Sequence, residues 1–153
     1  MLSNPWYASL VVVHVLVAVI SFGALGMSGA YANLVVRTPD PYSSATLLRY
    51  FRPSSNLAER LIFLTPVFGG LALIFSGDSS RAYPYIGLAI WVGAMGVATA
   101  SLWPSEKEIQ LQLVSESRDA EVLIDAAKRC ERAALVTTVL FVGALVVMIA
   151  QPG

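Results

Sequence analysis

The sequence carries little charge, and this shortage decides its class. Only 13% of its 153 residues are Asp, Glu, Lys or Arg, about half of the ~25% usual in soluble domains, and 56% are hydrophobic. A soluble domain of this size needs more charge to cover its surface. The shortage therefore excludes a soluble globular or disordered protein and indicates a polytopic membrane protein. The length fits a single integral membrane domain over residues 1–153.

Cysteine and histidine are equally scarce, with one residue of each. Cys130 has no partner for an internal disulfide, and no set of Cys and His ligands for zinc or an iron–sulfur cluster exists, so we predict no metal site. With one histidine and no nucleophile beside an evident base, we also predict no catalytic residues and favour a protein that is not an enzyme. Ten basic residues balance ten acidic ones, which gives no general attraction to nucleic acid.

Long apolar runs, by contrast, are plentiful, and four of them are long enough to cross a bilayer. They cover about residues 7–36, 57–76, 85–103 and 133–150. The first run lacks a basic leader and is too long for a signal peptide, so we expect it to stay as a transmembrane helix. Together the runs predict an all-α, polytopic protein with an up-down bundle of four transmembrane helices.

Two connecting segments have the pattern of amphipathic helices. Residues 44–51 place three apolar side chains on one face of a short interfacial helix. Residues 105–132 follow Pro104, which we expect to end the third helix, and they carry charges between apolar residues at helical spacing. We predict a helical cytoplasmic segment there, with a break near Ser117, that packs on itself as a hairpin or offers a docking surface. The apolar stripe of this segment consists of Ile109, Leu113, Ala120, Ile124 and Ala127.

Basic residues predict the orientation. All of the Lys and Arg residues except Arg81 lie in or beside the two longer connections. The positive-inside rule places these connections in the cytoplasm and both termini outside, in the inner (plasma) membrane of the cell.

His14 is the candidate functional residue, because ionisable side chains inside a membrane are costly and often functional. It could form a structural hydrogen bond to a neighbouring helix, ligate haem or another cofactor, bind a metal or relay a proton. Counting along the helices places Gly69 or Gly70, Trp91 and Gly143 at the same depth. Met27, Met95 and Met148 also lie within the spans, as second haem ligands or as packing residues.

Two further features concern the second helix. Pro66 predicts a kink and a backbone carbonyl left free near Ile62. Glu59 and Arg60 are expected to mark the inner membrane surface and to pair locally. We expect no buried carboxylate within the predicted spans, which argues against a typical proton-coupled transporter or pump.

The run HVLVAVISFG, from His14 to Gly23, resembles the opening of a family of small four-helix bacterial membrane proteins of unknown function. The end of the chain, Val146–Ile149 followed by Gln151 and Pro152, resembles the end of the same family. Similar openings occur in the copper-resistance protein D family and in HemJ-type protoporphyrinogen oxidases. In HemJ-type proteins the equivalent histidine is a haem ligand, so the resemblance implies that His14 could bind haem b.

Three functions remain open at this point. The first is a non-catalytic accessory protein or a small-molecule or cofactor-binding membrane module. The second is a b-type haem redox protein with His14 as an axial ligand, and the third is a small transporter. We expect the lipid bilayer as a partner, together with further copies of the chain or a larger membrane complex.

Overall fold

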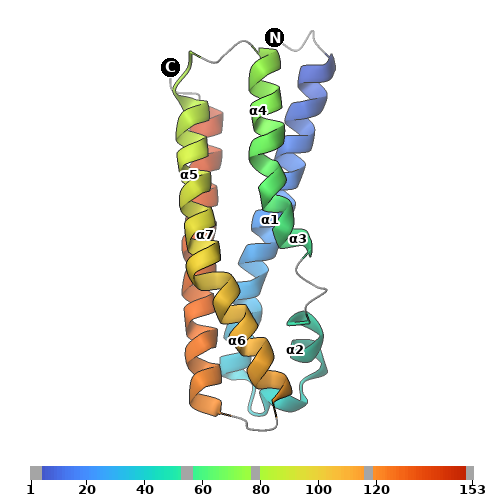
Figure 1. Ribbon diagram of the computed structural model, residues 1–153, viewed down its shortest axis with the longest axis vertical. Coiled ribbons are helices and arrows are strands. Elements are labelled where there is room, and N and C mark those ends of the chain that lie inside the picture. The colour runs from blue at the N-terminus through green and yellow to red at the C-terminus, as the bar shows by residue number, and fades with distance from the viewer. Residues whose placement is uncertain (1–4, 53–56, 77–79, 116–118, 151–153) are drawn as a thin grey trace.

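The computed structural model describes residues 5–52, 57–76, 80–115 and 119–150, and within these ranges the chain is helical apart from short connections, with no strand. The all-α prediction is therefore confirmed. Figure 1 shows a long bundle in which α1 begins and α7 ends at the same end, as an up-down arrangement requires.

Four helical units form the bundle. The first is α1, Pro5–Arg37. The second comprises α3 (Leu57–Arg60), the 3₁₀ turn η2 (Leu61–Leu64) and α4 (Thr65–Ser76), and the third comprises α5 (Tyr83–Val97), the π-helical turn η3 (Ala98–Leu102) and α6 (Trp103–Val114). The fourth is α7, Ala120–Ala150. Each unit is long and apolar enough to cross a membrane, so the chain is a multi-pass membrane protein.

The helices are not packed evenly around the bundle. α1 packs mainly on α7 and α4, and α5 packs mainly on α7. α4 and α5 follow each other in the sequence but share few contacts, and Figure 1 shows them well separated on the face toward the viewer.

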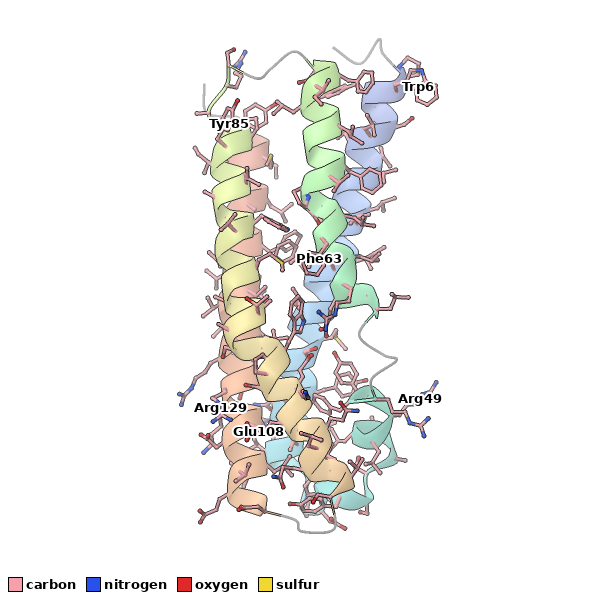
Figure 2. The ribbon with its side chains drawn as sticks, viewed as in Figure 1. Trp6, Arg49, Phe63, Tyr85, Glu108 and Arg129 are labelled. Atoms are coloured by element: carbon pink, nitrogen blue, oxygen red, sulfur yellow. The ribbon has the colours of Figure 1, made fainter. Side chains whose placement is uncertain are left out.

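One end of the bundle extends beyond the membrane. A hydrocarbon core of about 30 Å takes roughly 20 helical residues. Counted inward from Ser76 and from Tyr83, this length reaches Leu57 and Leu102. In Figure 2, Trp6 and Tyr85 lie near one end, while Arg49, Glu108 and Arg129 lie toward the other. The charged halves of α6 and α7 therefore belong to a polar extension, in which Arg129 pairs with Glu108 and Asp125.

Pro104 does not end the third helix, which corrects our expectation. The chain continues from α5 through η3 into α6, and the Trp103 N–H donates to the Ala98 carbonyl, five residues earlier. A proline inside an α-helix lacks its N–H and clashes with the carbonyl four residues before it. The wider π turn, which ends at Leu102 two residues before Pro104, relieves this conflict, so the helix runs on to Val114.

The extension packs as the expected hairpin, although two of the five residues predicted for its apolar stripe were wrong. α6 and α7 contact each other, and Ile109, Leu113 and Ala127 are buried. Ala120 and Ile124 are exposed instead. The helix ends at Val114 and restarts at Ala120, which resets its rotational phase, and Ser117 lies outside the described residues. The buried face of α7 in this region comprises Leu123, Ala126, Ala127 and Cys130.

The short amphipathic helix is confirmed. α2 covers Ala45–Tyr50, and the Ser44 hydroxyl accepts a hydrogen bond from the Leu47 N–H at its first turn. Leu47 and Phe51 are buried in the apolar core. α2 contacts α1 and α6, and a 3₁₀ turn, η1 (Pro41–Ser43), precedes it.

Candidate functional site: a membrane histidine and a buried carboxyl cluster

His14 faces α4 and is partly buried between two helices. Its Nδ1 atom lies 2.8 Å from the backbone carbonyl oxygen of Thr65. Because a carbonyl only accepts hydrogen bonds, Nδ1 carries the ring proton in a neutral imidazole and Nε2 keeps its lone pair. The hydrogen bond therefore fixes both the orientation and the tautomer of the ring.

Gly69 makes room for this imidazole. A Cβ atom at residue 69 would lie 2.9 Å from His14 Cε1 and 3.1 Å from Nδ1, so a larger side chain would displace the ring. A Cβ at Gly70 or Gly143 would meet nothing within 4 Å. Of the small residues expected at the depth of His14, Gly69 is therefore the one in contact with it.

The carbonyl of Ile62, which Pro66 was predicted to leave without its helical N–H donor, accepts a hydrogen bond from Trp91 instead. The Trp91 Nε1–H donates to the Ile62 carbonyl over 3.0 Å. The Thr65 N–H bonds to the same oxygen, as the 3₁₀ geometry of η2 requires. His14 from α1 and Trp91 from α5 are thus hydrogen-bonded to backbone carbonyls in the second helical unit, at Thr65 and at Ile62. The Thr65 hydroxyl is buried there, and no hydrogen-bond partner occurs for it within the described ranges.

The methionines occupy packing positions. The methyl group of Met148 fills the space above Gly87, where α5 meets α7. Met95 is buried in the apolar core, whereas Met27 is half exposed on the outer side of α1. These positions favour packing over ligation for all three side chains.

A second polar site lies where the membrane core is expected to end. We call it the boundary cluster, and it draws residues from α1, α2, α3, α6 and α7. Its members are Ser28, Tyr50, Glu59, Trp103, Glu106 and Cys130.

Glu59 is the centre of the boundary cluster. Glu59 is 2% exposed, which contradicts the prediction that it marks the membrane surface. The Ser28 hydroxyl donates to Oε1 over 2.6 Å, and the Trp103 indole N–H donates to Oε2 over 3.0 Å. Arg60 is exposed and stacks over the Trp103 ring at 4.2 Å. Across the part of the chain that the structure describes, no ion pair joins Glu59 to Arg60.

Glu106 brings a second carboxyl to the same place. It follows Trp103 by one helical turn and is 4% exposed. Its carboxyl interacts with the Ser28 hydroxyl and with the Glu59 carboxyl. Glu59 lies within the second predicted span, so the expectation that the spans contain no buried carboxylate was wrong.

The remaining members of the boundary cluster are Tyr50 from α2 and Cys130 from α7. The Tyr50 and Ser28 hydroxyls are 2.8 Å apart, and the Tyr50 ring stacks on Tyr31 at 3.8 Å. Burial raises the pKa of the Tyr50 phenol well above its usual value near 10. The buried Cys130 thiol donates to the Ser28 carbonyl over 3.8 Å, so it acts as a packed polar group.

The sequence contained one signal for this cluster that its interpretation did not use. Glu59 lies three residues inside the second apolar run, where an acidic residue needs a partner. The sequence could not predict that Ser28 and Trp103, which are distant from Glu59 along the chain, would be its hydrogen-bond donors. No group of three His, Cys, Asp or Glu side chains suited to a metal ion occurs among the residues described.

Comparison with protein-family models, with curated proteins and with solved structures gave no match. The geometry of the two polar sites is therefore the basis for a functional conclusion.

Proposed function

We propose that the protein is a non-catalytic membrane module that binds a small ligand or cofactor, and that His14 holds it. The observation that carries this proposal is the hydrogen bond from Nδ1 to the Thr65 carbonyl. A purely structural histidine would make the same bond, so the support for a ligand comes from the ring nitrogen that the bond does not use. The bond also leaves Nε2 as a free electron-pair donor at the opposite side of the ring.

Haem b is the candidate cofactor for this arrangement. Metal-bound histidines almost always donate their second ring N–H to a carbonyl, carboxylate or water, which fixes the ring and raises the basicity of the ligating nitrogen. Thr65 provides such a carbonyl, and Gly69 keeps the ring position clear. A haem held by His14 would supply one-electron redox chemistry. The alternative function is accordingly a b-type haem redox protein.

Absorption spectra test this proposal. The protein is expressed with ample haem, purified in detergent, and measured oxidised and dithionite-reduced beside His14→Ala and Gly70→Ala. Gly70→Ala is the matched control, because its side chain would meet nothing within 4 Å. We expect a Soret band and sharp reduced bands in the wild type and in the control, and their loss in His14→Ala. A colourless wild-type protein would eliminate haem as the ligand.

We also propose that the polar extension faces the cytoplasm and that both termini lie outside the inner membrane. The support is the concentration of Lys and Arg at one end, together with the positive-inside rule. A cysteine introduced at exposed Arg81 should react with a membrane-impermeant maleimide in intact cells, whereas one at exposed Arg49 should react only after lysis. The reverse pattern would invert the topology.

The bilayer is the first partner in this proposal, and association with further copies or with a larger membrane complex is the second. The exposed apolar side chains along α1, α4, α5 and the outer half of α7 support contact with lipid.

A further inference from the structure

The boundary cluster holds more negative charge than its surroundings neutralise. The groups that face the two carboxyls are Arg60 from α3, Tyr50 from α2, and Cys130 from α7, with Glu131 acting on the thiol. Arg60 supplies the one positive charge in this set, and it lies on the exposed face of Trp103. Two ionised carboxylates in contact would repel strongly in such a buried position.

The hydrogen-bond donors distinguish the two carboxyls. Both oxygens of Glu59 accept from neutral donors, Ser28 and Trp103, which stabilises the ionised form. The Ser28 hydroxyl has one proton to donate, and it points to Glu59. Glu106 meets the same hydroxyl and the Glu59 carboxylate, and is therefore best accommodated as the neutral acid. This division leaves one negative charge in the cluster, opposite Arg60.

We propose that Glu59 and Glu106 form a proton-binding site, which keeps the boundary cluster closed while it holds one proton and opens it when that proton is lost. On opening, the Glu106 O–H bond breaks, the proton passes to water and both carboxyls are ionised. Their repulsion then drives α3 away from α6. This inference does not depend on a ligand at His14.

Irregular helical turns flank the site and provide the means of movement. The 3₁₀ turn η2 begins directly after Arg60, and the π turn η3 ends directly before Trp103. Such turns inside helices often mark hinges.

Infrared spectroscopy of the full-length protein in detergent tests the proton directly. A buried protonated carboxyl gives a carbonyl band that shifts in D₂O, and we expect it in the wild type at neutral pH with reversible loss at alkaline pH. Glu106→Gln should abolish this titrating band. Glu108→Gln, which changes a half-exposed carboxyl on the same helix, should retain it. A wild type without the band at neutral pH would overturn the proposal, as would a Glu106→Gln protein that keeps it.

Glu59→Gln provides a second variant if Glu106→Gln does not fold. It removes the neighbouring negative charge while keeping the shape of the side chain. The Glu106 proton should then bind about tenfold more weakly, which moves the midpoint of the band to lower pH. An unchanged midpoint would show that the two carboxyls are not coupled and would overturn the proposal.

The movement is tested by the distance between two spin labels. Cysteines at exposed Leu57 on α3 and Lys107 on α6 accept the labels, while buried Cys130 is shielded. We expect a longer and broader distance distribution at the alkaline pH at which the carboxyl band disappears, and no such change in the Glu106→Gln background. A distance that stays constant through the loss of the band would contradict the opening.

Discussion

The contact between Gly69 and His14 gives a sharp prediction, because a single methyl group should break the hydrogen bond that fixes the imidazole. A Cβ at residue 69 would lie 2.9 Å from His14 Cε1, so Gly69→Ala should push the ring away from the Thr65 carbonyl. Gly70→Ala on the next residue would place its Cβ in open space.

The expected free energies follow from opposing effects. An alanine in place of a helical glycine gains about 0.8–1.0 kcal/mol of helix propensity. The displaced ring loses a hydrogen bond of about 0.5–1.5 kcal/mol, and overpacking costs about 1–3 kcal/mol. Gly69→Ala should therefore destabilise the protein by about 0.5–3.7 kcal/mol, whereas Gly70→Ala should stabilise it by about 1 kcal/mol.

Unfolding by SDS in mixed micelles, followed by circular dichroism, measures both variants against the wild type. A third comparison isolates the cause: in the His14→Ala background, Gly69→Ala should be stabilising, because the ring it would strike is gone. If Gly69→Ala stabilises the wild-type protein as much as Gly70→Ala does, the packing of His14 on Gly69 is refuted.

Three further predictions concern the other polar contacts. Trp103→Phe removes the indole donor to the ionised Glu59 and should lower the free energy of unfolding by about 1.5–3 kcal/mol in the same SDS assay; a change below 0.5 kcal/mol would argue against this bond. Trp91→Phe leaves the Ile62 carbonyl with only its 3₁₀ partner and should cost about 1 kcal/mol, measured likewise. Because the folded-state pKa of Tyr50 is raised, its contribution to stability is complete below pH ~10 and falls as the pH rises further, so Tyr50→Phe should flatten the pH dependence of unfolding in that range.

The hydropathy of the sequence was enough to predict the four membrane-spanning segments. The four spans depend on the length and apolarity of local runs, and those properties do not depend on the tertiary structure. The carbonyl freed by Pro66 was predicted for the same reason, because the missing N–H of a proline has a fixed position relative to Ile62. Counting residues from the outer end placed His14 at the depth of Gly69, and the structure brings these two residues into contact.

The boundary cluster could not be predicted in the same way, because its members meet only through tertiary packing. Glu59 beside Arg60 has the local pattern of a membrane-surface pair, and only the approach of Ser28 and Trp103 explains its burial. The phase of α7 was missed because one helical stripe does not continue from α6, which ends at Val114, into α7, which begins at Ala120. The continuity of α5 and α6 depends on a π turn, which has no sequence signature as clear as the proline that follows it.

Native mass spectrometry of the detergent-purified protein tests most directly whether His14 binds a ligand. The wild type and Gly70→Ala should carry the same non-covalent mass beyond detergent and lipid, and His14→Ala should lack it while remaining folded. Identical ligand-free masses for all three proteins, after expression with ample haem, would contradict the account and leave His14 with a structural role alone.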